Sequence, residues 1–244
     1  MICIYCFSGT GHSKAVAKFF ADSLKTEITE ITQEMKIPCI ESEISIVVFP
    51  IYNGNIPKHV KLILPKINSK YFVLIATYGR MSTGNVLQES SKLVKGKVIA
   101  AAYVPTGHTY LNEPAEFDTE ILQTILMRIE HPKEIIIKKE RKGVLPRFFP
   151  NLRSRLSVKI HRTADCNKCN LCMKNCPVKA ITDKGIDRKC IRCLRCVKNC
   201  PENALNVSFS PLLKNTLKTK NVHNLKFYII VKIKKADGFA CFLL

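Results

Sequence analysis

The chain of 244 residues contains no stretch of about twenty apolar residues, which is the length that a membrane-spanning helix needs. Its strongest apolar run, residues 227–231, is bracketed by Lys226 and Lys232. We therefore expect no transmembrane segment. Residues 229–233 are instead expected to form either an edge strand or an interfacial segment.

Several signatures of enzymes are also missing. The chain has neither the Gly-Lys-Ser/Thr ending of a nucleoside-triphosphate loop nor the wider glycine pattern of a Rossmann dinucleotide site. No Ser-His-Asp set and no pair of carboxylates is recognisable around a pocket. We therefore predict no catalytic residues and expect no independent hydrolytic chemistry.

Cysteine, by contrast, is abundant: eight of the twelve cysteines form two copies of one run, and each run ends in proline. Three closely spaced thiolates can each bind one iron corner of a cubane, while the fourth cysteine completes the neighbouring cluster. The spacing therefore predicts electron transfer by two [4Fe-4S] clusters that share their ligands crosswise. The first predicted set is Cys166, Cys169, Cys172 and Cys200, and the second is Cys190, Cys193, Cys196 and Cys176.

The similarity between the two runs extends beyond the sulfur atoms. Each cysteine recurs 24 positions later, and residues 178–181 correspond to residues 202–205 after the prolines. This pattern indicates an internal duplication. The small side chains of Ala180 and Ala204 would let the backbone approach inorganic sulfide, and the apolar residues beside them would keep water off the clusters.

Zinc and disulfide bonds are the alternatives for so many cysteines. Zinc uses paired C-x2-C ligands in a closed tetrahedron, where a third cysteine after another two-residue gap has no obvious role. The chain enters an apolar strand at Met1 without a basic n-region or cleavage site, so we expect a cytoplasmic protein with reduced thiols. Cys3 and Cys6 would face opposite sides of that strand as small buried hydrophobic residues.

Length and cysteine distribution predict two unequal domains. The first is large enough for its own core, whereas a cysteine-rich unit of about 45 residues seldom folds on hydrophobic burial alone. In the linker, Phe148 and Phe149 are expected either to anchor the two halves together or to lie on the surface. We expect a first domain at residues 1–140, a basic linker at 141–163, an iron-sulfur domain at 164–207 and a Lys-rich tail at 208–244.

Strand-like and helical patterns alternate through the first domain. Strand-like runs cover residues 2–7, 44–49, 71–76 and 98–103, and helical patterns cover 13–24, 57–67, 83–94 and 117–130. This order predicts an α/β fold with a doubly wound parallel sheet, in which ligands bind beyond the carboxyl ends of the strands. Three loops are expected at those ends, namely residues 8–13, 50–57 and 77–84.

The first of these loops has the composition of a phosphate-binding loop, with a plain turn and N-cap as the alternative. Hydroxyl groups and backbone amides come together there at a helix N-terminus, where the helix dipole attracts an anion. The N-terminal half resembles the flavodoxin family, whose Ser/Thr-x-Thr-Gly-x-Ser/Thr pattern is matched here. From residue 1 to about 207, the chain resembles a family in which a flavodoxin-like half precedes a small α+β bacterial two-cluster ferredoxin half. The loop consists of Ser8, Gly9, Thr10, Gly11, His12 and Ser13, and Ser8, Thr10, Gly11 and Ser13 carry the match.

This resemblance implies FMN bound between the three loops. Tyr78 is expected to be the stacking aromatic, with its ring exposed at a strand end, and Gly79 would let the backbone approach the flavin. The chain has no tryptophan, which is a frequent stacking partner in flavodoxins, and a flavodoxin-like scaffold without flavin is the alternative. Besides the first loop, the cofactor-binding residues implied are Tyr52, Asn53 and Gly54 on one side of the ring and Tyr78, Gly79 and Arg80 on the other.

Basic residues outnumber acidic ones by 39 to 19, which gives a formal charge of +20. The cofactors would offset part of this excess, because each oxidised cluster with four thiolates adds about two negative charges. Lys168, Lys174, Arg192, Arg195 and Lys198 lie between the cluster ligands, where positive charge favours the reduced clusters. The remaining surplus, in the linker and tail, is expected to be a solvated face or a docking face for an acidic redox partner.

Together these features predict an electron-transfer protein that relays single electrons between a low-potential donor and a flavin or an external acceptor. One alternative is an iron-sulfur flavoenzyme that reduces a small organic substrate at FMN, with Arg80 and His108 binding or protonating that substrate. The other is a basic nucleic-acid-binding protein with structural clusters. We expect no specific nucleic-acid binding, because no recognition motif or aromatic-basic repeat accompanies the charge.

Overall fold

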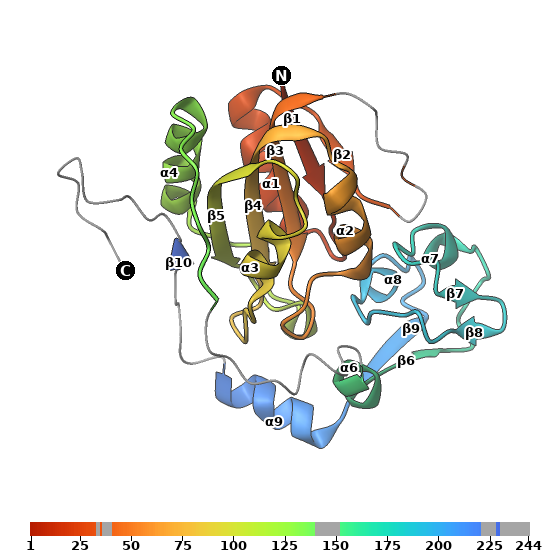
Figure 1. Cartoon of the computed structure of the whole chain (residues 1–244). Helices are drawn as coiled ribbons and strands as arrows, with labels where there is room; N and C mark the ends of the chain where they lie inside the picture. Colours follow the sequence, from red (N-terminus) through yellow and green to blue (C-terminus); the bar gives the residue numbers. More distant parts are fainter. Residues whose placement is uncertain (33–34, 36–40, 140–151, 221–227, 230–244) are drawn as a thin grey trace.

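The computed structural model describes residues 1–32, 35, 41–139, 152–220 and 228–229, and its N-terminal half contains a sheet of parallel strands (Figure 1). The spatial order of the strands is β10-β5-β4-β3-β1-β2. The first five strands are parallel in the order 2-1-3-4-5, which is the flavodoxin-like arrangement. These strands are β1 (Ile2–Cys6), β2 (Ile28–Glu30), β3 (Ser42–Pro50), β4 (Ser69–Tyr78) and β5 (Lys97–Pro105).

Continuous burial explains why the central strands form. In β3, for example, Ile46, Val47, Val48 and Phe49 are all fully buried, as expected for a parallel strand covered on both faces. The predicted doubly wound α/β fold is therefore confirmed. The short strand β2 was not predicted, because it has only three residues and none of them is buried.

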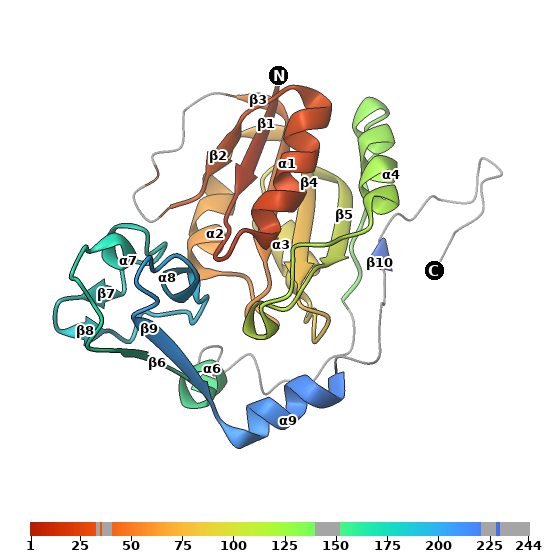
Figure 2. The ribbon, with the colours of Figure 1, turned by 180° about the vertical axis from the view of Figure 1, so that it is seen from behind.

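Helices cover both faces of the sheet (Figure 2). One face packs against α1 (His12–Leu24) and α4 (Thr119–Glu130), and the other packs against α2 (Lys58–Ile63) and α3 (Val86–Ser91). Side chains of β1 alternate between the two cores: Cys3 packs against the α2/α3 side, while Cys6 is buried on the α1/α4 side. The prediction that these two cysteines face opposite sides is confirmed.

A small α+β domain follows the parallel sheet. Strand β6 pairs antiparallel with β9, and β7 pairs with β8 in a second two-stranded sheet. Residues 158–162, expected in the linker, therefore belong to a strand of the small domain. Its elements are α6 (Leu152–Ser157), β6 (Val158–Arg162), α7 (Leu171–Lys174), β7 (Ile181–Thr182), β8 (Gly185–Ile186), α8 (Arg195–Lys198) and β9 (Leu205–Phe209).

The tail returns to the first domain. Helix α9 (Pro211–Lys220) follows β9, and β10 (Tyr228–Ile229) pairs antiparallel with β5 at the edge of the large sheet. The edge strand predicted at residues 229–233 is thus present at its first residue, and the other four lie outside the described residues. Phe148 and Phe149 also lie outside them. Within the described ranges, no helix has the length and apolar character needed to cross a membrane.

Candidate functional site

The sequence duplication is repeated in the backbone of the small domain. Lys168 and Asn170 have φ angles of 59° and 60°, and their equivalents 24 positions later, Arg192 and Leu194, have 57° and 63°. After each pair of left-handed residues the chain forms a four-residue helix, α7 in the first copy and α8 in the second. Left-handed φ angles are costly for residues other than glycine, so the surrounding loop must enforce them.

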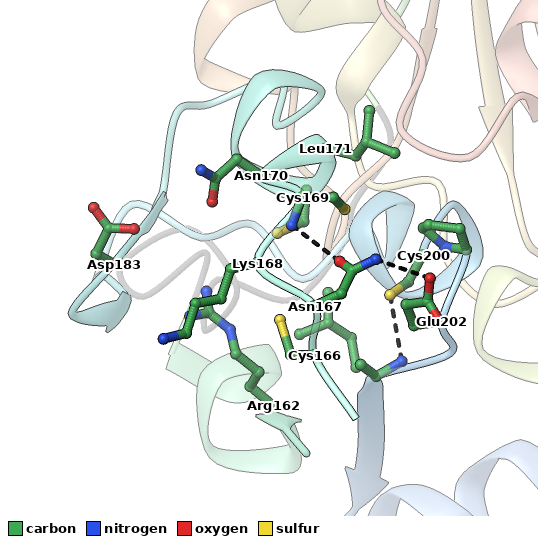
Figure 3. A pocket seen from close by; sticks show the side chains of 14 residues that line it. Arg162, Cys166, Asn167, Lys168, Cys169, Asn170, Leu171, Asp183, Cys200 and Glu202 are labelled. Carbon is green, nitrogen blue, oxygen red and sulfur yellow. Dashed lines mark hydrogen bonds between the residues drawn. The ribbon is translucent and has the colours of Figure 1, made fainter. Parts of the chain in front are cut away.

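One set of four cysteines surrounds a cavity of about 300 Å³ (Figure 3). Three members of this outer set lie on one loop before and within α7, and the fourth comes from the other copy of the motif, 28 residues beyond Cys172. Cys169 is exposed, so this site opens toward solvent. The outer set is Cys166, Cys169, Cys172 and Cys200.

Hydrogen bonds hold the loop of the outer set in shape. The amide of Asn167 donates to a carboxylate oxygen of Glu202 at 2.9 Å, and its oxygen accepts a bond from the backbone amide of Cys169 at 3.0 Å (Figure 3). The backbone amide of Ala204 donates to Sγ of Cys200 at 3.3 Å. Amide donors of this kind stabilise negative charge on cysteine sulfur.

The other four cysteines form an inner set, and their thiols influence one another electrostatically. Burial raises the pKa of Cys196 to about 12, and the negative charges of Cys193, Cys190 and Cys176 act in the same direction. Burial likewise raises the pKa of Cys193 to about 11. Four thiolates at this place would repel one another unless a cation lay between them. The inner set is Cys176, Cys190, Cys193 and Cys196.

The two sets are related by the duplication. The backbone amide of Ala180 donates to Sγ of Cys176 at 3.3 Å, as Ala204 does to Cys200 in the second copy. Both alanines are buried. All eight motif cysteines lie among the described residues, yet no three His, Cys, Asp or Glu side chains of that part of the chain come together closely enough to hold one metal ion. In the outer set, four thiols placed around a cavity suit a multi-iron cluster better than a single zinc ion.

The three predicted loops meet at the carboxyl edge of the large sheet. The hydroxyl groups of Ser13 and Thr77 are hydrogen-bonded at 2.7 Å and join the first loop to the end of β4. A Cβ atom on Gly84 would collide with the carbonyl oxygen of Gly54, so the second and third loops also touch. The expectation that these loops share one edge is therefore confirmed.

The first loop has the shape of an anion cradle. Gly11 has a φ angle of 100° and caps α1, and its amide donates to Oγ of Ser8 at 3.1 Å. No described atom lies within 4 Å of the position that a Cβ of Gly11 would take, so the space beside this residue is open. The first amides of α1 have no helical partner, and they can bind a phosphate oxygen.

His12, the fifth residue of this loop, faces the segment after β5. It is buried, and burial lowers its pKa, while hydrogen bonding to the backbone of Gly107 opposes that shift. Apart from His108 in the flavoenzyme alternative, the loop at residues 106–113 was not predicted as part of the site, although its position after the predicted strand 98–103 was a usable signal. It contacts the first loop through the hydroxyl groups of Thr109 and Thr10, which are 3.1 Å apart.

Tyr78 differs from its predicted role. The ring was expected to be exposed, but it is only 7% exposed and lies in the core with its edge against Tyr103. That expectation is wrong, because side chains alternate along β4 and residue 78 faces the α2/α3 side of the sheet.

The other two residues predicted in the third loop follow Tyr78 directly. Gly79 is in close contact with His108, whose Cδ2 would lie 2.6 Å from an added Cβ. Arg80 is half-buried and has a φ angle of 57°.

The second loop makes a two-residue hairpin turn. Asn53 and Gly54 both have positive φ angles, and the backbones of Tyr52 and Asn55 exchange two hydrogen bonds, as in a type I′ turn. This turn presents the hydroxyl of Tyr52 to the first loop, because a Cβ on Gly9 would lie only 2.6 Å from the hydroxyl oxygen of Tyr52. Tyr52 thus points toward the first loop and the small domain.

The small domain contacts this edge of the sheet through the inner cysteine set. A Cβ on Gly9 would lie 2.7 Å from the Cβ of Cys193, and burial together with the charge of Cys193 raises the pKa of Tyr52. A second contact joins Tyr110 to Phe209 at the end of β9, with ring centroids 5.4 Å apart. Sequence patterns could not reveal these contacts, because both depend on how the two domains pack.

Comparison with known proteins supports iron-sulfur chemistry in the small domain. Residues 147–214 match the family of 4Fe-4S dicluster domains. A candidate flavoprotein from Bacteroides eggerthii resembles the chain with a TM-score of 0.38 and 14% identity, over 53% of this chain and 97% of that protein. No curated protein matches the chain.

Proposed function

We propose that this chain is an electron-transfer protein that carries two [4Fe-4S] clusters and FMN. The observation that carries the proposal is the cavity of about 300 Å³ in which Cys200 joins three cysteines of the other motif. This is the crosswise arrangement expected for a duplicated two-cluster motif. We assign one cluster to the outer set and the other to the inner set.

The fit of the inner set rests on the chemistry of its donors. Burial, together with the negative charge of neighbouring cysteines, raises the pKa of Cys193 to about 11 and that of Cys196 to about 12, which favours the protonated form of these two thiols when no metal is bound. Iron must therefore displace protons when it binds, and it supplies the positive charge that the site lacks. The clusters, when present, supply one-electron chemistry.

The flavin assignment rests on this chain's own loops. We place the FMN phosphate at residues 8–13, where α1 offers free amides and Ser8, Thr10 and Ser13 offer hydroxyl groups. Asn53 and Gly54 in the hairpin turn and Gly79 after β4 remain the proposed neighbours of the flavin ring. FMN supplies one-electron or two-electron chemistry when bound. It would therefore connect the clusters both to partners that exchange one electron and to partners that exchange two.

We also propose that the external partner is an acidic redox protein and that the chain works in the cytoplasm. Around the exposed outer set, Arg162, Lys168 and Lys174 are solvent-exposed cations. Such residues attract an acidic partner and speed its association at low salt. A compartment that keeps thiols reduced is required for eight cysteines to bind iron rather than pair with one another.

Spectroscopic redox titration of anaerobically purified protein tests this function. We expect iron-sulfur and flavin signals that bleach in separate steps, and we expect electron exchange with small redox proteins that slows as salt is added. Absence of any reversible bleaching, or of any exchange with a protein partner, would contradict a role in electron transfer.

A second candidate function, reduction of a small substrate at the flavin, is favoured by one observation. Nε of Arg80 is buried and has no hydrogen-bond partner among the described residues, and the residue lies in the third loop of the site. A buried donor without a partner is costly, so an anionic ligand would satisfy it. Saturation kinetics with a small carboxylate acceptor would support this function. The alternative of a nucleic-acid-binding linker and tail depends in part on residues 140–151, 221–227 and 230–244, which lie outside the described residues.

Substitution of Ser13 is expected to weaken FMN binding. The change Ser13→Ala removes a hydroxyl from the phosphate loop and leaves the buried hydroxyl of Thr77 without its 2.7 Å partner. We expect the dissociation constant, measured by quenching of flavin fluorescence, to rise about tenfold, which corresponds to ~1.4 kcal/mol. The matched control is Ser23→Ala on the same helix, where the hydroxyl bonds only the carbonyl of Phe19 and is exposed. Equal affinities of the two variants would contradict phosphate binding at this loop.

A further inference from the structure

Arg195 lies inside the second cysteine motif, but its side chain reaches into the first domain. Nε donates to the carbonyl oxygen of Gly9 at 2.7 Å, and Nη2 donates to the carbonyl oxygen of Ser8. Nη2 also forms an ion pair with Glu30 at 2.9 Å, at the end of β2. One guanidinium group therefore binds two consecutive carbonyls of the proposed phosphate loop and a carboxylate beside it.

The same side chain also ties the two copies of the motif together. Nη1 of Arg195 donates to the carbonyl oxygen of Asn175 at 3.2 Å, immediately before the inner cysteine Cys176. Donors on all three guanidinium nitrogens are thus in use. The planar fork of arginine can reach acceptors in several directions at once, which the single ammonium group of lysine cannot.

The duplication shows that cluster binding itself does not require an arginine here. The equivalent position in the first copy, 24 residues earlier, is Leu171, which begins α7 and is 40% exposed. Leu171 lines the cavity of the outer set, so that set is built without a basic residue at this position. Arg195, unlike Leu171, makes hydrogen bonds to the first loop.

The inner cysteine set is packed closely against the same loop. Cys193 is the nearest of its members, and a Cβ on Gly9 would lie 2.7 Å from the Cβ of Cys193 and 3.5 Å from its sulfur. Glycine is therefore needed at position 9 for this approach. Ile191, which lies on the same loop as Cys193, packs against both the core of the small domain and the core on the α2/α3 side of the large sheet. A change in the shape of the loop that carries the inner cysteines would therefore shift residues 8–13.

We propose that Arg195 is a positioning residue that couples the two cofactor sites, so that cluster binding by the inner cysteine set strengthens FMN binding at residues 8–13. This inference rests on the proposed function. A cluster bound by the inner set would fix the loop at residues 190–196 and so keep Arg195 on the carbonyls of Ser8 and Gly9. With these carbonyls turned toward the guanidinium, the amides of the loop are left to face an anion. Coupling of this kind is reciprocal, so FMN must equally strengthen retention of the inner cluster.

The test compares FMN affinity in four full-length proteins: wild type, Arg195→Met, Arg195→Lys and Lys174→Met. Each is measured anaerobically by flavin fluorescence, both with clusters and after iron has been removed. Lys174→Met is the matched control, because it removes an exposed positive charge from the first copy of the motif. Iron content is measured in every sample, so that a loss of clusters is not mistaken for a loss of coupling.

We expect the clusters to tighten FMN binding about tenfold in the wild type and in Lys174→Met. Arg195→Met should abolish this difference while keeping its iron, and Arg195→Lys should recover only part of it. Hydrogen exchange at residues 8–13 should be faster in Arg195→Met than in the wild type when both carry clusters. A cluster-dependent difference that persists in Arg195→Met, or the absence of one in the wild type, would overturn the inference.

The proposed function and this inference can fail separately. If the wild type binds no FMN under any condition, the flavin part of the proposed function is wrong, and the coupling to FMN falls with it. If the wild type binds FMN but Arg195→Met binds it equally well with clusters present, only the role of Arg195 is wrong. The conservative double change Arg195→Lys with Glu30→Asp keeps both charges and checks that the contact, rather than general folding, is being measured.

Discussion

Removal of iron from the full-length chain is expected to unfold the small domain while the large sheet stays folded. The small domain has few buried hydrophobic residues, and two of those in its core are themselves proposed cluster ligands, Cys176 and Cys190. A unit of this size is not stable on hydrophobic burial alone, so binding of the clusters and folding are the same event. By contrast, the two cores of the first domain are extensive and contain none of the proposed cluster ligands.

Hydrogen exchange followed by mass spectrometry measures this outcome. After anaerobic treatment with a chelator, amides of β6 and β9 should exchange as fast as in denaturant, while amides of β3, β4 and β5 keep their protection. The iron-loaded chain is the control. If both halves remain protected without iron, the clusters do not hold the small domain together.

Single substitutions in the two motifs are expected to remove one cluster each, and the crosswise arrangement decides which one. Cys200→Ser should destroy the cluster of the outer set, because Cys200 lines that cavity although it belongs to the second motif. Cys176→Ser should destroy the cluster of the inner set. In each variant the iron content should fall from about eight to about four per chain.

Alkylation of free thiols identifies the cluster that is lost. In Cys200→Ser, the remaining outer cysteines should become reactive, while Cys190, Cys193 and Cys196 stay protected. Ligation within each motif predicts the opposite labelling, so that pattern would disprove the crosswise assignment. Cys3→Ser is the control, because Cys3 packs against the core of the first domain and should leave all eight irons in place.

The features that were predictable from sequence are those set by local spacing. The cysteine runs predicted a duplicated site, and the duplication reappears as similar φ angles 24 residues apart. The apolar runs predicted the central strands, because strands buried on both faces consist of continuous hydrophobic residues. The three loops at the carboxyl edge followed from the strand order alone.

Features that depend on packing between distant segments could not be predicted. Tyr78 lies at the end of a strand, and only the tertiary structure shows that it faces the core and contacts Tyr103. Strand β2 is too short and too exposed to leave an apolar run. In the sequence, Arg195 is one of several basic residues between the motif cysteines, and its bonds to Ser8 and Gly9 join residues that are 187 and 186 positions apart.

The most direct test of the account is the amount of iron, acid-labile sulfide and zinc in protein purified anaerobically after iron supplementation. Two clusters require about eight iron and about eight sulfide per chain, with no stoichiometric zinc. Zinc in tetrahedral thiolate sites together with an absence of labile sulfide would contradict the assignment of both cysteine sets, and with it the role in electron transfer.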